Sequence, residues 1–153
     1  MTDEQLMQQA ITLSAAAVRH GNEPFGAVLA RNGEIVYTNE NQIHTRHDPT
    51  FHAEAGLIRE FCAETGITDL REYTLYSSCE PCFMCSGAMV CARLGRLVYA
   101  AANTDLAKIR GKTGCTCSAM VFARSSRQPA VTAGVLREQA LPILQQYFAS
   151  RRG

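Results

Sequence analysis

Apolar side chains recur every three to four positions through the first twenty residues, at Leu6, Met7, Ala10, Ile11, Leu13, Ala17 and Val18. This period predicts an amphipathic helix. Thr2 and Gln5 stand at the spacing of a capping box at its start, and Gly21 and Asn22 end it.

The pattern then changes to that of strands. Phe25–Ala30 and Ile35–Thr38 are short β-prone runs, and the Asn32-Gly33 pair between them predicts a hairpin. Two more strands are expected over 73–77 and 97–101. A last strand lies at either 119–123 or 130–132, and the pattern does not choose between them.

Three further segments have helical period: 52–64, 83–92 and 135–150. The last contains Pro142, which predicts a kink or a start at Leu141. Residues 104–118 are predicted to be irregular and could close over a ligand as a flap. Helices alternating with strands indicate an α/β protein, a three-layer α/β/α sandwich with a central mixed sheet. The length of 153 residues fits a single domain, 1–153.

Composition narrows the classes of function. The formal net charge is +1, whereas a large nucleic-acid-binding face usually carries a strong basic bias. The first residues show no charged-then-apolar leader, and no run approaches the roughly 20 apolar residues of a membrane helix. We therefore expect a cytoplasmic protein without membrane contact. Its seven cysteines are expected to be reduced, and their clustering indicates metal binding or catalysis more often than disulfides.

Two segments carry the candidate chemistry: His52-Ala53-Glu54, and Pro81 to Cys85. Cys82 and Cys85 have C-x-x-C spacing at the start of a predicted helix, whose N-terminus favours the thiolate form. Thiolate and imidazole ligands favour zinc. With His52 as the third ligand, one position stays open for water, as in catalytic zinc sites, and Glu54 can move protons there.

A structural zinc site is the alternative. It would need a fourth protein ligand, for which Cys79, Cys91 and His47 are the candidates. Glu54 would then be an ordinary surface residue of its helix.

The combination H-x-E…P-C-x-x-C is the signature of zinc deaminases. With segments 24–28, 47–54, 74–88 and 98–105 around it, the chain resembles the cytidine deaminase-like superfamily. Within it, the chain is similar to the branch of guanine deaminase, cytosine deaminase and tRNA adenosine deaminase.

The resemblance implies Zn²⁺ on His52, Cys82 and Cys85, with Glu54 as the catalytic proton shuttle. It also implies three substrate contacts, from the Asn41 side chain, the Ala53 N–H and the apolar wall of Phe25. Asp105, the carboxylate nearest the predicted flap, is a further candidate contact. The superfamily further implies a homodimer or a larger assembly.

The expected reaction replaces the amino group of a nucleobase-type ring by an oxo group and releases ammonia. Residues 78–82 and 99–101 resemble the free-base branch more than the tRNA enzymes. Residues 106–117 lack the second acid that guanine deaminase supplies from its flap, which favours isocytosine or cytosine over guanine itself. The alternatives are a nucleoside, a non-catalytic zinc subunit, and adenosine in tRNA, which would be read by Arg93, Arg96, Arg151 and Arg152.

Overall fold

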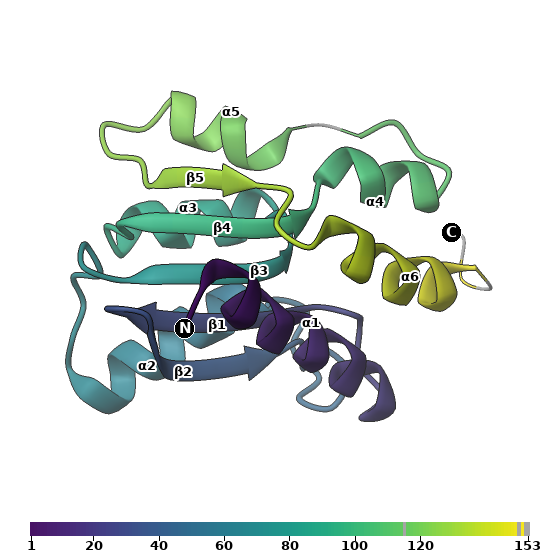
Figure 1. The fold of residues 1–153 in the computed structure, drawn as a ribbon, viewed down its shortest axis with the longest axis horizontal. Helices are drawn as coiled ribbons and strands as arrows, with labels where there is room; N and C mark the ends of the chain where they lie inside the picture. Colours follow the sequence, from purple (N-terminus) through teal and green to yellow (C-terminus); the bar gives the residue numbers. More distant parts are fainter. Residues whose placement is uncertain (115, 150, 152–153) are drawn as a thin grey trace.

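A five-stranded sheet runs through the centre of the molecule, in the order β2-β1-β3-β4-β5 (Figure 1). Its strands are β1 (Gly26–Arg31), β2 (Glu34–Glu40), β3 (Thr74–Cys79), β4 (Arg96–Ala101) and β5 (Ala130–Ala133). β1 pairs antiparallel with β2 and β3, whereas β3, β4 and β5 are parallel. This computed structural model describes residues 1–114, 116–149 and 151, and it confirms the mixed sheet.

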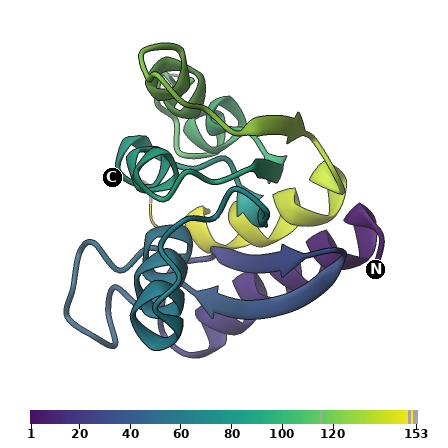
Figure 2. The ribbon, with the colours of Figure 1, turned by 90° about the vertical axis from the view of Figure 1, so that its left-hand side faces the viewer.

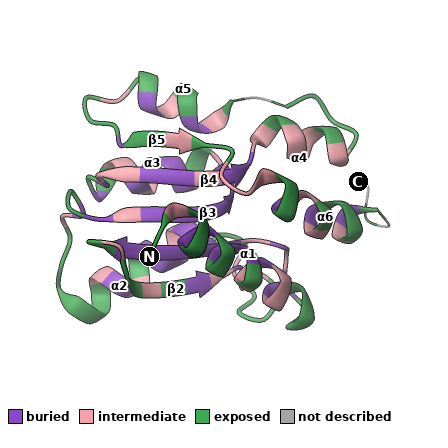
Figure 3. Ribbon diagram, viewed as in Figure 1, coloured by how far each residue is buried: buried purple, intermediate pink, exposed green. Residues whose placement is uncertain are grey.

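Helices cover both faces of the sheet, as Figure 2 shows from the side. α1 (Asp3–Arg19) and α6 (Arg137–Phe148) pack on one face, in a cluster with Val28, Tyr76 and Val98. α2 (Ala53–Thr65), α3 (Phe83–Cys91) and α5 (Cys117–Ala123) pack on the other, in a cluster with Leu29, Leu75 and Leu97. Both faces are therefore buried along the central strands (Figure 3), and the three-layer α/β/α sandwich is confirmed.

The helix starts follow the capping pattern of the sequence. The Thr2 hydroxyl accepts from Gln5 N at 3.1 Å, and the Gln5 side chain accepts from Thr2 N at 2.8 Å, so the predicted capping box of α1 is present. His52 is the N-cap residue of α2, and Cys82 is that of α3. Two of the predicted metal ligands therefore stand at helix starts.

The segment 104–118 differs from its prediction, because it begins with helix α4 (Asn103–Ile109). The Asp105 carboxylate accepts from Ala102 N at 2.9 Å and satisfies the start of this helix. Leu106 and Ile109 pack against the apolar cluster under α1 and α6. The prediction of an irregular flap is thus wrong for this part of the chain.

The structure also fixes the last strand and the start of the last helix. Residues 119–123 belong to α5, so the last strand is β5 at 130–133. α6 begins at Arg137 and continues through Pro142. Cys115, Ser150 and Arg152 lie outside the described residues. None of the described helices combines the length and the apolar character that crossing a bilayer requires.

Candidate metal and catalytic site

The N-termini of α2 and α3 meet at one place, and three possible ligands gather there. Cys82 Sγ lies 3.5 Å from His52 Nδ1 and accepts from Cys85 N at 3.5 Å. The ligand atoms of His52, Cys82 and Cys85 all lie within 4.8 Å of one another. The folding of two short motifs onto two adjacent helix starts therefore assembles the predicted ligand set.

This donor set fits zinc. One imidazole and two thiols, partly or fully buried, are ligands that zinc prefers, and three protein ligands leave a fourth position open. Within the described residues the group has these three members only. Cys79 is buried, whereas Cys91 and His47 are exposed, and none of them joins the group, so a fourth protein ligand of a structural site is not found among them.

The electrostatics of the two thiols differ. The hydrogen bond from Cys85 lowers the pKa of Cys82 to about 4, so this thiol is ready to act as an anionic ligand. The same contact with Cys82, together with burial, raises the pKa of Cys85. The Cys82 contact also raises the pKa of His52. The three groups share protons that a bound cation would displace.

Glu54 lies on the first turn of α2 and is only 6% exposed. Burial of its carboxyl group raises its pKa to about 7, with a contribution from the nearby Cys82 sulfur. A carboxyl group with such a pKa can both take up and release a proton near neutral pH. Glu54 is therefore not an ordinary surface residue but a buried acid beside the ligand group.

A cavity of about 170 Å³ opens next to this group. Its lining comes from the predicted site and from residues that the sequence did not single out: Glu23, Phe25, Asn41, His52, Glu54, Glu80, Cys82, Asn103, Leu106 and Arg110. A ring bound in this cavity would lie next to both Glu54 and the ligand group.

Asn41 is 1% exposed, and the structure fixes the orientation of its amide. Its Oδ1 accepts from Glu23 N at 3.3 Å and from Ile43 N at 3.1 Å. Within the described residues Nδ2 has no acceptor, so Asn41 presents a hydrogen-bond donor to the cavity. A ligand with a hydrogen-bond acceptor at this position would satisfy Nδ2.

The other predicted contacts have different surroundings. Phe25 lines the cavity and packs against both apolar clusters. Ala53 is fully buried and is not among the lining residues, so a ring contact by its N–H stays a prediction. Asp105 lines a separate cavity and is paired with Arg137 at 2.6 Å, so the structure does not bring it to the site.

Sequence reasoning missed the wall that α4 supplies. Asn103, Leu106 and Arg110 are spaced by three and four residues and lie on one side of α4 and its C-cap. A spacing of three and four residues places side chains on one face only in a helix, and this segment was predicted to be irregular. Glu80 was also missed as a lining residue, although it lies inside the Ser-Cys-Glu-Pro-Cys run.

Glu80 joins three elements at the edge of the cavity. It is 7% exposed, and its carboxylate accepts from Asn103 N at 3.0 Å and from the Ser118 hydroxyl. These contacts tie the beginnings of α4 and α5 to the loop that carries Cys82. Glu80 thereby holds the α4 wall against the ligand group.

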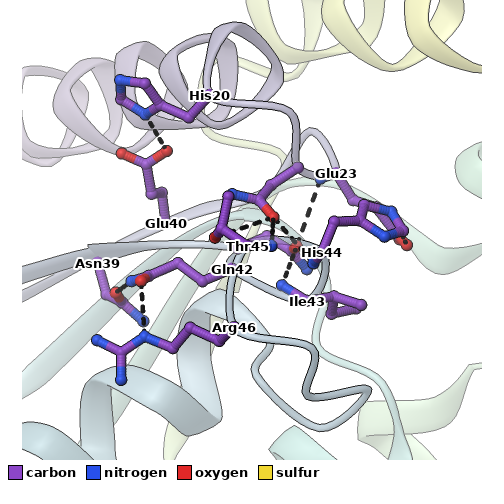
Figure 4. Close-up of polar contacts among 11 residues, drawn as sticks. His20, Glu23, Asn39, Glu40, Gln42, Ile43, His44, Thr45 and Arg46 are labelled. Atoms are coloured by element: carbon purple, nitrogen blue, oxygen red, sulfur yellow. Dashed lines mark hydrogen bonds and ion pairs between the residues drawn. The ribbon is translucent and has the colours of Figure 1, made fainter.

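The end of β2 contacts the start of α2, and Figure 4 shows how Asn39 at this end is bonded to Gln42 of the following loop. Asn39 Nδ2 donates to Ala53 O at 3.0 Å, and its Oδ1 accepts from Gln42 Nε2 at 2.8 Å. Gly56 permits this close approach, since a Cβ there would lie 2.7 Å from Asn39 Nδ2 and 2.8 Å from the Phe51 ring. The end of β2 and the loop after it thus position the turn that carries His52 and Glu54.

Residues 1–101 match the family model of the cytidine and deoxycytidylate deaminase zinc-binding region. The chain belongs to this family. The match covers the ligand motifs and Glu54, so this deaminase is a zinc enzyme and a hydrolase that acts on a C–N bond.

Relatives of the deaminase act on different substrates. Guanine deaminase from Bacillus subtilis is 42% identical over 109 residues, which are 71% of this chain and 70% of that protein. The tRNA-specific adenosine deaminase of the same organism is 35% identical over 153 residues, which are 98% and 91% of the two chains. The structure of guanine deaminase from Nitrosomonas europaea superposes with a TM-score of 0.82 at 26% identity, covering 95% of this chain and 84% of that one.

Proposed function

We propose that this deaminase acts on a free amino-substituted nucleobase with a guanine-, isocytosine- or cytosine-type ring. The observation that carries the proposal is the cavity of about 170 Å³ between the ligand group and the α4 wall. Pockets for drug-sized ligands usually hold about 300–1,000 Å³. The smaller volume fits a single base, with its amino-bearing carbon beside Glu54.

The residues have distinct roles in this proposal. His52, Cys82 and Cys85 would hold zinc, which when bound polarises a water molecule and lowers its pKa towards neutrality. The Glu54 carboxylate takes a proton from the attacking water and passes it to the ring nitrogen next to the amino-bearing carbon. The carboxylate, deprotonated again, takes the remaining proton from the hydroxyl group now on the ring carbon and gives it to the amino group. The C–N bond breaks, ammonia leaves, and the C–O group becomes a carbonyl.

Asn41 and Phe25 would orient the ring during these steps. The free Nδ2 of Asn41 would donate to an acceptor on the ring, and Phe25 would cover an apolar face of it. Leu106 on α4 would help to exclude water from the reacting atoms. Glu80 also lines the cavity, but its carboxylate is bonded to Asn103 N and the Ser118 hydroxyl, so its role in this proposal is to hold the α4 wall.

Adenosine in tRNA is the second candidate, because the tRNA-specific relative covers nearly the whole chain. The arginines that were expected to read RNA give it little support. Arg96 is paired with Asp3 at 2.7 Å, and Arg151 stacks on Tyr147 at 4.3 Å, so both are engaged within the chain. Arg93 is exposed, and Arg152 lies outside the described residues.

Ammonia release tests the proposal directly. The zinc-loaded protein is assayed with guanine, isocytosine, cytosine and adenine, with their nucleosides, and with tRNA. We expect turnover of at least one free base. Turnover of tRNA alone, falling steeply with added salt, would establish the second candidate instead. Turnover of nucleosides alone would show that the cavity opens far enough for a ribose.

We also propose a homodimer, formed over the exposed surface of α3 and α5. Phe83 and Met120 are each 51% exposed and line one apolar hollow there. Light scattering at working concentration measures the assembly, and a mass of one chain would refute it. Cys62, Cys79 and Cys91 are free thiols outside the ligand group, which supports a reducing compartment such as the cytoplasm; fractionation of the source cells checks this location.

A further inference from the structure

Arg110 is a cation that lines the cavity and has no carboxylate partner among the described residues. The carboxylates in the lining belong to Glu23, Glu54 and Glu80, yet among the described residues none forms an ion pair with Arg110. Arg110 Nε is shielded from solvent and has no hydrogen-bond partner among the described residues. An unsatisfied buried donor is costly, so this group is prepared for a ligand that the chain itself does not supply.

The guanidinium is also held in place. Its carbon lies 5.1 Å from the centroid of the Phe148 ring on α6, within the range of a cation–π contact. The Arg110 backbone N–H donates to Leu106 O at 3.0 Å and anchors the residue at the end of α4. A donor that is fixed in this way recognises an acceptor with little loss of side-chain freedom.

A guanidinium only donates hydrogen bonds, and Asn41 presents a donor to the same cavity. A substrate that satisfies both must carry acceptor atoms away from the amino-bearing carbon. Guanine carries such acceptors at O6 and N7, an edge that arginine commonly binds with two hydrogen bonds. Isocytosine carries an exocyclic oxygen in the corresponding place, whereas adenine has none.

We propose that Arg110 is a specificity-determining residue that donates to the exocyclic oxygen of an amino-oxo ring. The inference deepens the proposed function and rests on it for the identity of the reacting ring. It favours guanine and isocytosine over ring systems that have an amino group but no oxygen.

Two pairs of compounds test the contribution of the exocyclic oxygen, because the members of each pair differ only in that group. Guanine and 2-aminopurine share the 2-amino group, and only guanine has the 6-oxo group; isocytosine and 2-aminopyrimidine form the same pair in a single ring. The experiment measures kcat/KM on all four for the wild type and for Arg110→Met. Because each compound is compared with itself in the two proteins, its intrinsic reactivity cancels.

We expect Arg110→Met to lower kcat/KM for the oxo compound of a pair by roughly ten- to a hundredfold, the usual worth of a hydrogen bond to a charged group. The oxygen-free compound should change little. Lys108→Met is the matched control, because it removes a cation of the same helix that lies outside this cavity. It should change neither compound, and zinc content should be equal in all three proteins. An equal loss on both members of each pair would overturn the inference and leave Arg110 a structural role.

A binding measurement keeps the inference separate from the proposed function. Hypoxanthine has the 6-oxo group and no amino group to lose, so calorimetry with it needs no turnover. Weaker binding of hypoxanthine to Arg110→Met than to the wild type would support the role of Arg110, even if no free base were deaminated. Equal affinity for the two proteins, or binding to neither, would overturn it.

Discussion

Both carboxylate oxygens of Asp105 accept hydrogen bonds from Arg137, at 2.6 and 2.9 Å, and join the start of α4 to the start of α6. One of these oxygens also accepts from Ala102 N. The residue expected to touch the substrate therefore holds the helix that forms the cavity wall.

This pair predicts a dependence of stability on pH. Arg137 lowers the pKa of Asp105 below its usual 3.8. An acid with a lowered pKa in the folded state stabilises the protein above its unfolded-state pKa, and the contribution is lost as the pH falls through the folded-state value. Asp105→Asn, which keeps an acceptor for Ala102 N, should cost about 1 kcal/mol or less at pH 7. The difference should be smaller at pH 3, which lies below the unfolded-state pKa of 3.8.

Urea unfolding of the wild type and of Asp105→Asn at the two pH values measures this difference. Glu138→Gln is the control, because Glu138 binds the same arginine through an exposed contact at 3.0 Å. A difference for Asp105→Asn that persisted unchanged at low pH would contradict the assignment to the ion pair.

Replacement of Glu54 separates proton transfer from metal binding. Glu54→Gln keeps the size of the side chain and should leave zinc content intact, yet lower kcat by about 10²–10⁴-fold, the usual worth of positioned proton transfer. Glu64→Gln, an exposed change on the same helix, should keep full activity. Ammonia release and metal analysis on the same samples measure both properties, and retained activity in Glu54→Gln would refute the proton-shuttle role.

Metal content distinguishes the three predicted ligands from the other cysteines. Cys82→Ala and Cys85→Ala should each lower zinc from one ion per chain towards none, since each removes one of three ligands. They should also lose the thermal stabilisation that added zinc gives the wild type. Cys91→Ala, at an exposed cysteine, should bind zinc normally. One zinc per chain in Cys82→Ala would disprove this ligand set.

Two helix glycines should respond in opposite ways to alanine. Gly56→Ala places a Cβ 2.7 Å from Asn39 Nδ2 and should destabilise the fold by about 1–3 kcal/mol. Gly87→Ala, on α3, meets nothing within 4 Å and should stabilise by about 0.5–1 kcal/mol through the lower entropy of the unfolded chain. Thermal unfolding compares the two, and a stable Gly56→Ala would mean that the Asn39 and Phe51 side chains can move away from α2.

The sequence predicted the ligand group because its spacing is local: each motif lies at the start of one helix, and the metal chemistry restricts the residue types. It did not predict the opposite wall of the cavity. The anchors of that wall join residues far apart in the chain, as Asp105 joins Arg137 across 32 positions and Glu80 joins Ser118 across 38. Such pairs form only when the helices pack on the sheet, and the apolar pattern of 103–109 is too short to indicate a helix by itself.

The reacting groups and the opposite wall of the cavity come from different helices, so they can change independently in evolution. The groups that would bind zinc and move protons stand on the starts of α2 and α3, while Arg110 and Leu106 come from α4, which is attached through other contacts. Replacements in α4 can therefore alter which ring is accepted without disturbing the groups that break the C–N bond. A scaffold divided in this way can exchange one base for another through a few changes on a single short helix, and the range of substrates among its relatives is what such a division would produce.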